Sequence, residues 1–190
     1  MIVSVHCYGV WDPENRPNEE MAGLETYLSS VVDWLNNNYG KVAEVIVHGA
    51  MVNDAGETEA DTFGDELDRR LKERRFIVPM VYDRNSASTI SSVKFAFEFD
   101  REKHYGMKDL VIVCDRARRQ KTKYLARYWR KKTASGFCTT KYRVIDFDRP
   151  DPNARSNRFV QLIEILAMTV LGVERVRRKI ESLPERQKPV

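Results

Sequence analysis

The stretch FIVPMVYDRNSASTISSVKFAFEFDREKHYGMKDLVIVCD, residues 76–115, decides the fold class. Short apolar runs at both of its ends, residues 76–82 and 109–115, favour β-strands. Between them, residues 88–104 carry apolar side chains at helical spacing. A strand, a helix and a second strand in this order are typical of two parallel strands joined by a crossover helix.

The same alternation extends in both directions from this stretch. We expect further strands over residues 2–10, 42–50 and 141–148, and further helices over residues 19–38, 57–75, 119–133 and 156–183. Because the strands are apolar throughout, the pattern predicts a sheet that is covered on both faces. The expected fold is therefore a three-layer, Rossmann-like α/β fold with a mainly parallel five-stranded sheet. Pro79 cannot donate a ladder hydrogen bond, which favours an edge position for its strand.

Length and composition favour one soluble domain. The chain has 190 residues, of which 42% are hydrophobic and 32% charged, enough apolar material for a core. We expect a single domain over residues 1–183 and a frayed tail over 184–190. Residues 159–173 are too short and too interrupted, by Glu164, to span a bilayer. The N-terminal stretch lacks the pattern of a signal peptide, so a cytoplasmic protein without a membrane span is expected.

Cysteine and charge content narrow the functional classes further. Cys7, Cys114 and Cys138 are scattered, and no Cys/His cluster with the spacing of a metal site is present. We expect reduced thiols, with Cys7 and Cys114 buried in adjacent parallel strands and no disulfide. The net charge of +4 is compatible with anionic partners without requiring them.

Ligands of open α/β sheets bind beyond the carboxyl ends of the strands, which directs attention to the loops that follow the strands. The loop after the third strand contains Asp83, Ser86 and Thr89. Ser86 or Ser88 is suited to cap the following helix. The alternative is an anion site, in which hydroxyls and free N–H groups converge at the helix N-terminus. The chain lacks both the glycine-rich dinucleotide fingerprint and the Walker loop, so a nucleotide-like ligand would be held in another way.

Two other groups of residues lie at the predicted carboxyl edge. His6 and His48 end neighbouring strands, so their imidazoles are candidates for one shared rim. After the fourth strand, Asp115 is followed by Arg116 and Arg118, whose guanidinium groups suit phosphate or carboxylate oxygens.

Flanking charges have simpler structural explanations. Arg119, Lys121 and Lys123 are expected to lie on a solvated helix face. Glu59 falls in the first turn of a helix, where its charge complements the helix dipole and Thr58 is suited to cap.

Three segments resemble the YdcF/SanA-like proteins, a family of unknown function with a Rossmann-like fold. The first is ETEADTFGDEL, with Glu59, Ala60, Phe63 and Leu67 at the family's motif positions. The second is the loop after the third strand, which is similar to an acidic-x-x-Ser-x-x-Thr-x-x-Asn signature at Asp83, Ser86 and Thr89 but has Ser92 at the asparagine position. The third is LVIVCDRARRQKTKYLAR, which lacks the histidine usual in that turn.

This resemblance covers most of the chain and implies a pocket rather than a reaction. In the family, the Ser/Thr loop and the acidic residue line a pocket at the carboxyl edge of the sheet, and a bacterial relative binds S-adenosylmethionine. With the residues at the other strand ends added, the expected ligand-binding residues are Glu59, Asp83, Ser86, Thr89, Asp115, Arg116, Arg118, His6 and His48. We expect Asp83, Ser86 and Thr89 to line the principal pocket, beside Glu59 and the Asp115–Arg116 turn.

Three functional classes remain open at this stage. The first is a small-molecule pocket protein for an S-adenosylmethionine-like or phosphorylated ligand, with or without catalysis; a general base would be His6, His48 or a carboxylate. The second is a nucleic-acid-binding protein that uses the basic helix 116–132, where Tyr124, Tyr128 and Trp129 are interleaved with Lys and Arg. The third is a non-catalytic interaction protein, whose last helix either pairs in a homodimer or covers the sheet.

Overall fold

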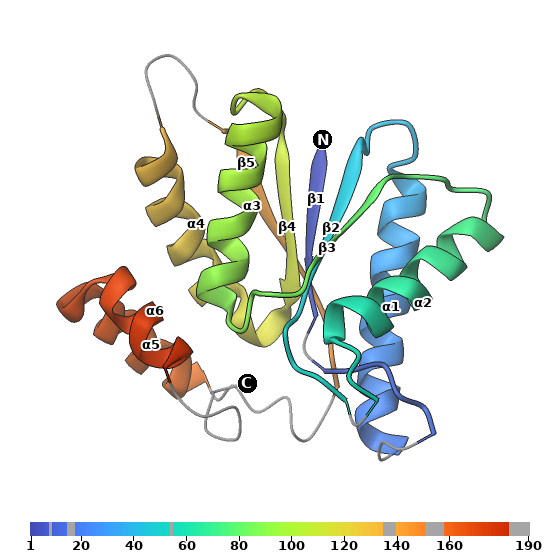
Figure 1. The fold of residues 1–190 in the computed structure, drawn as a ribbon, viewed down its shortest axis with the longest axis horizontal. Helices are drawn as coiled ribbons and strands as arrows, with labels where there is room; N and C mark the ends of the chain where they lie inside the picture. Colours follow the sequence, from blue (N-terminus) through green and yellow to red (C-terminus); the bar gives the residue numbers. More distant parts are fainter. Residues whose placement is uncertain (8, 15–17, 54, 135–139, 151–157, 183–190) are drawn as a thin grey trace.

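The computed structural model describes residues 1–7, 9–14, 18–53, 55–134, 140–150 and 158–182. Five strands alternate with helices along the chain (Figure 1). The strands are β1 (Ile2–His6), β2 (Glu44–His48), β3 (Met80–Asp83), β4 (Leu110–Asp115) and β5 (Tyr142–Phe147). The helices are α1 (Asn18–Asn37), α2 (Glu59–Glu73), α3 (Thr89–His104), α4 (Arg119–Thr133), α5 (Arg158–Leu171) and α6 (Val173–Glu181), with a 3-10 turn η1 (Arg116–Arg118) before α4.

The sheet has the strand order β3-β2-β1-β4-β5, and every neighbouring pair is parallel. This confirms the predicted three-layer α/β fold. β3 lies at one edge directly after Pro79, as the missing proline N–H led us to expect. The chain reverses its direction of winding between the central strands β1 and β4. Their following loops therefore diverge, which is the arrangement that leaves a binding crevice in such sheets.

Helices cover both faces of the sheet. α1 and α2 lie on one face, and α3 and α4 lie on the other, with α5 and α6 beside them (Figure 1). Successive strand residues point to opposite faces. In β1, Val3 and Val5 join the core under α1 and α2, whereas Ile2 joins the core under α3 and α4. The apolar strands thus supply two cores at once, which is why they show no alternation.

Two helix N-termini follow the rules read from the sequence. Thr58 caps α2 in a capping box: its side chain accepts from the N–H of Asp61, whose carboxylate accepts from the N–H of Thr58. Ser88 caps α3 by accepting from the N–H of Ser91. Of the two serines proposed as the α3 cap, Ser88 is therefore the one that acts.

The expectation of one closing helix over residues 156–183 is wrong. The helix is broken at Gly172, whose φ of 85° and ψ of 139° lie outside helical space and suit only glycine. The break lets α6 turn and pack Val173 and Ile180 into the core under α3 and α4.

α5 carries several large exposed apolar side chains, namely Val160, Leu162, Ile163, Leu166, Val170 and Leu171. Pairing of this surface with a second copy stays a prediction. Among the residues that the structure describes, no helix has the length and apolar character needed to cross a membrane.

Two of the three cysteines lie in the described part of the chain. Cys7, just after β1, and Cys114, on β4, are both buried free thiols, as predicted. Burial raises the pKa of the Cys114 thiol to about 12, so this thiol is protonated at neutral pH. Cys138 and the tail 184–190 fall outside the described residues.

Candidate functional site

Four neighbouring strands end in a buried ionisable residue. His6 ends β1, His48 ends β2, Asp83 ends β3 and Asp115 ends β4, and each is at most 2% exposed. Since parallel strands end at the same side of a sheet, these side chains lie along one edge. Buried ionisable groups are costly and are therefore uncommon away from functional sites or compensating partners.

His48 is the centre of a buried hydrogen-bonded chain that crosses three strands. Its Nδ1 is 2.7 Å from Oδ2 of Asp83, and its Nε2 is 2.8 Å from Oγ of Ser4. An ionised carboxylate only accepts, so Nδ1 donates to Asp83; in the neutral ring, Nε2 then accepts from Ser4. Asp83 is the cross-strand partner of His48, which places the two side chains together.

The atoms of this chain are those of a hydrolase triad, but their placement differs. Ser4 lies in the middle of β1 and is fully buried, so its hydroxyl is out of reach of a substrate. Its role is to fix the imidazole of His48. Sequence reasoning missed Ser4, although a lone serine in the apolar run IVSVH was a signal. It also missed Phe95 of α3, whose ring packs edge-on against His48 with centroids 5.6 Å apart.

The polar loop after β3 serves Asp83 itself. The carboxylate accepts from the N–H of Asn85 at 3.1 Å and from the hydroxyl of Ser86. Burial alone would raise the pKa of Asp83. The hydrogen bond and charge of His48, and the hydrogen bonds from Ser86 and Asn85, outweigh burial, so the pKa of Asp83 is lowered overall. Asn85 and Ser86 therefore stabilise the carboxylate of Asp83, and Thr89 takes no part in these hydrogen bonds.

His6 lies beside this chain, and its ring meets that of His48 edge-on with centroids 5.2 Å apart. The predicted meeting of the two imidazoles at one rim is therefore present. Burial, followed by the charges of His48 and Arg118, lowers the pKa of His6 well below its usual value. His6 is accordingly a neutral, buried ring at physiological pH.

We expect the stability of the protein to fall as the pH drops from 7 to 5. The unfolded chain takes up a proton at His6 below about pH 6.5, whereas the folded chain, with its lowered pKa, does not. This difference lowers the free energy of unfolding by at most about 2 kcal/mol at pH 5, the limit set by the pKa of His in the unfolded chain. Urea unfolding of wild type and His6→Gln at pH 7, 6 and 5 measures it, and the variant should have the flatter pH dependence. Parallel profiles would contradict the assignment to His6.

A buried ion pair follows β4. Arg118 contacts the carboxylate of Asp115 through its guanidinium group, and its N–H donates to the same carboxylate at 2.8 Å. Both side chains are almost fully buried. Arg118 therefore compensates Asp115, and it also lies near enough to His6 to disfavour that ring's protonation.

The other cations of this turn behave differently from one another. Arg116 is exposed and pairs with Asp146 and Asp148 beyond the sheet edge, at 3.3 and 3.0 Å. Arg119 is exposed as well, and it pairs with the same Asp146. The expectation of a solvated Lys121 is wrong.

Lys121 is 6% exposed and pairs with Glu164 of α5 at 2.9 Å. Burial lowers the pKa of Lys121, and Glu164 partly offsets this effect. The physical reason for its burial is the helix phase: Lys121, Leu125 and Trp129 share the face of α4 that packs inward.

Glu59 lies at the start of α2, close to Gly49 and Cys7. A Cβ on Gly49 would be 2.4 Å from Cβ of Glu59, so only glycine fits where β2 passes the start of α2. Burial raises the pKa of the Cys7 thiol, and the charge of Glu59 raises it further. Glu59 therefore belongs to the same edge of the sheet, on the side of α1 and α2.

Ser86 and Thr89 are buried at the start of α3, and Thr89 forms no side-chain hydrogen bond to any described residue. A cavity of about 700 Å³ lies at the opposite, amino edge of the sheet, lined by residues that include Lys41, Tyr142 and Arg143. None of the nine predicted ligand-binding residues lines it. A pocket at their own edge stays a prediction.

No protein-family model, no curated protein and no solved structure matches this chain. Membership of the YdcF/SanA-like family therefore stays a prediction from the three segments. Within the described residues, no group of His, Cys, Asp and Glu side chains is arranged to hold a metal ion.

Proposed function

We propose that this chain binds a small nucleotide-like or phosphorylated molecule at the carboxyl edge of its sheet. The observation that carries the proposal is the buried ionisable residue at the end of each of four adjacent strands. Among the other buried ionisable side chains that the structure describes, Asp100 is the one that lies far from this edge. Groups that are costly to bury are thus concentrated where parallel sheets bind ligands.

The internal pairing of these groups assigns them different roles. His48, Asp83 and Ser4 form a rigid support, because each is fixed by a partner on a neighbouring strand. Thr89 stands directly after this support at the first position of α3, where free N–H groups and the helix dipole favour an anion. Thr89 is therefore the residue we assign to ligand contact. The resemblance to the YdcF/SanA-like family, in which one bacterial relative binds S-adenosylmethionine, supports the same loop.

We expect Thr89→Val to weaken ligand binding about tenfold, equivalent to the loss of one hydrogen bond to a charged group. The stability should change by less than about 0.5 kcal/mol, because the hydroxyl makes no hydrogen bond within the described protein. The ligand is first found by thermal-shift screening of wild type against S-adenosylmethionine, nucleotides and sugar phosphates. Affinity is then measured by calorimetry.

Ser88→Ala is the matched control, one residue away. It removes the α3 cap and should cost about 1 kcal/mol of stability without changing affinity. A screen in which no compound raises the melting temperature, or equal affinities for wild type and Thr89→Val, would refute the assignment.

A further inference from the structure

α4 is an unusually basic helix, and most of its exposed cations have no acidic partner among the residues that the structure describes. It contains seven Lys and Arg residues and no Asp or Glu. Arg119 and Lys121 are paired with carboxylates of β5 and α5. The remaining cations form no ion pair with any carboxylate in the described ranges; they are Lys123, Arg127, Arg130, Lys131 and Lys132.

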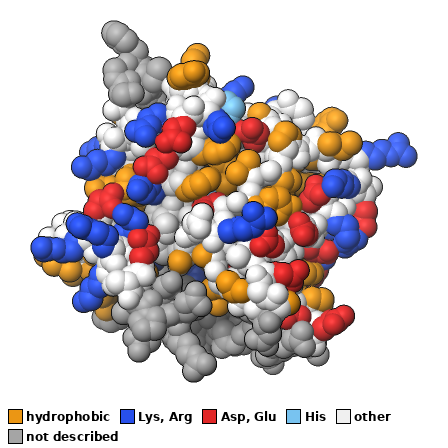
Figure 2. Space-filling model, in the orientation of Figure 1, with side chains coloured by type: hydrophobic (Ala, Val, Ile, Leu, Met, Phe, Trp, Pro, Cys, Tyr) orange, Lys and Arg blue, Asp and Glu red, His pale blue; other side chains and the backbone are white. Residues whose placement is uncertain are grey.

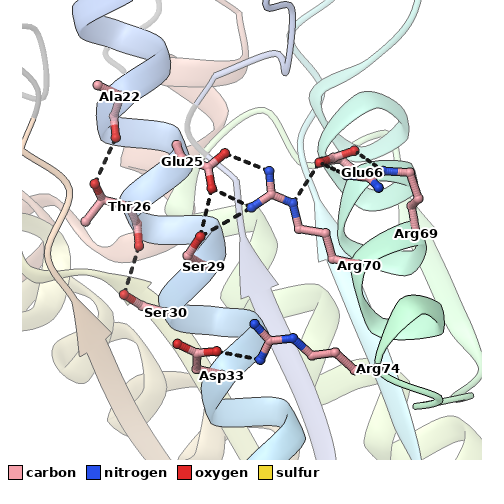
Figure 3. Close-up of polar contacts among 10 residues, drawn as sticks. All are labelled: Ala22, Glu25, Thr26, Ser29, Ser30, Asp33, Glu66, Arg69, Arg70 and Arg74. Carbon is pink, nitrogen blue, oxygen red and sulfur yellow. Dashed lines mark hydrogen bonds and ion pairs between the residues drawn. The ribbon is translucent and has the colours of Figure 1, made fainter.

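On α2, by contrast, exposed cations are paired with carboxylates. Arg70 lies between Glu25 of α1 and Glu66 of α2, and Arg69 shares Glu66 (Figure 3). Lys72 pairs with Asp68. On the side of the molecule where α2 lies, acidic and basic side chains are interspersed (Figure 2). The unpaired charges of α4 therefore distinguish this helix from α2.

The unpaired cations follow one face of α4. Lys123, Arg127, Arg130 and Lys131 have the spacing i, i+4, i+7 and i+8, which aligns them along one side of a helix. Over eight residues, this stripe extends about 12 Å along the helix axis. A single small anion spans only part of that length.

A second group of cations lies at the amino edge of the sheet. The guanidinium group of Arg130 lies over the ring of Tyr142, 5.9 Å from its centroid. Tyr142 lines the cavity of about 700 Å³, together with Lys41, Lys141 and Arg143. Asp109 is the single carboxylate among the residues lining this cavity. The contact between Arg130 and Tyr142 thus links the cations of α4 to those of the cavity, and we call the two groups together the basic track.

We propose that the basic track binds the phosphate backbone of single-stranded nucleic acid. The track consists of Lys123, Arg127, Arg130 and Lys131 on α4, and Lys41, Lys141 and Arg143 at the amino edge. Repeated cations over this length are complementary to a polyanion. The hollow at its end fits a flexible strand better than a flat bilayer. This function is separate from ligand binding at the carboxyl edge, since the track shares no residue with it.

The contacts indicate binding without sequence selection. Trp129 is buried, and Tyr124 is half-buried with its hydroxyl 3.2 Å from that of Thr169. Tyr128 is also half-buried; its ring packs edge-on against Trp129, and the ammonium group of Lys132 lies 5.9 Å from its centroid. Since all three aromatic rings of α4 are at least partly covered, we expect phosphate contacts to dominate over stacking. Affinity should therefore depend strongly on salt and weakly on base composition.

The test measures binding of fluorescein-labelled oligo(dT) to the full chain by anisotropy over a series of salt concentrations. Four to seven phosphate contacts predict a slope of log affinity against log salt of about −3 to −5. The variant Lys123→Ala, Arg127→Ala, Lys131→Ala should flatten this slope by about 2. At low salt it should weaken binding at least about tenfold. The variant Lys41→Ala, Lys141→Ala, Arg143→Ala should have a similar effect.

The control variant Arg69→Ala, Lys72→Ala, Arg74→Ala removes the same net charge from α2 and its C-cap, where carboxylates of α1 and α2 pair with these cations. It should bind oligo(dT) as wild type does. Equal losses in the control and in the track variants would overturn the proposal, since net charge alone would then explain binding. Tighter binding to a DNA duplex, or binding to anionic vesicles but not to oligo(dT), would overturn it as well.

Discussion

Asp83→Leu is expected to lower the free energy of unfolding by about 3–5 kcal/mol, because it removes the charged partner of a buried chain. Nδ1 of His48, the N–H of Asn85 and the hydroxyl of Ser86 would all lose their acceptor. For a chain of this size, the melting temperature should fall by about 10 °C. Urea unfolding at pH 7 and calorimetry measure the two quantities.

Two further variants separate this explanation from simple loss of packing. Asp83→Asn keeps an acceptor oxygen and should cost clearly less than Asp83→Leu. In the double variant Asp83→Leu, His48→Leu, both polar partners become apolar. Its loss should therefore be smaller than the sum of the two single losses. Additive losses would show that Asp83 and His48 are not coupled.

Arg118→Met is the second variant with a large expected effect, a loss of about 3–5 kcal/mol. The methionine fills much of the space of the arginine stem but leaves the carboxylate of Asp115 buried without its countercharge. Chemical unfolding at neutral pH gives the value. The cost arises from the stranded charge rather than from a lost contact.

Arg116→Met, two residues earlier, is the matched control. Its guanidinium group also pairs with carboxylates, but the side chain is 60% exposed, so the pairs are screened by solvent. The expected loss is about 0–1 kcal/mol. Similar losses at the two positions would mean that burial does not determine the strength of these ion pairs.

The sequence was sufficient to predict the fold class because each strand is a short, continuous apolar run. IVSVH, EVIVH and LVIVCD all became buried strands of one parallel sheet. The closing helix was different. A glycine inside an apolar helical pattern is normally tolerated. The pattern alone therefore could not show that Gly172 adopts a positive φ and turns the chain.

The candidate site could be predicted as a set of residues but not as a set of contacts. The rule for carboxyl ends located His48 and Asp83 correctly at one edge. Their pairing depends on β2 and β3 being neighbours, which the order of strands along the chain does not specify. Ser4 escaped notice because it lies within the strand. Lys121 was misplaced because a helix that is basic on most faces gives no sign of which face is buried.

The short strand β3 has a consequence for how copies of this protein meet. It forms one edge of the sheet over four residues only, and Pro79 precedes it without an N–H to donate. A β-strand of a second molecule can pair with a sheet edge only along a run of free backbone donors and acceptors. At β3 this run is only four residues long. The short edge strand and Pro79 therefore disfavour the addition of further strands at this edge, which is the first step toward amyloid-like assembly.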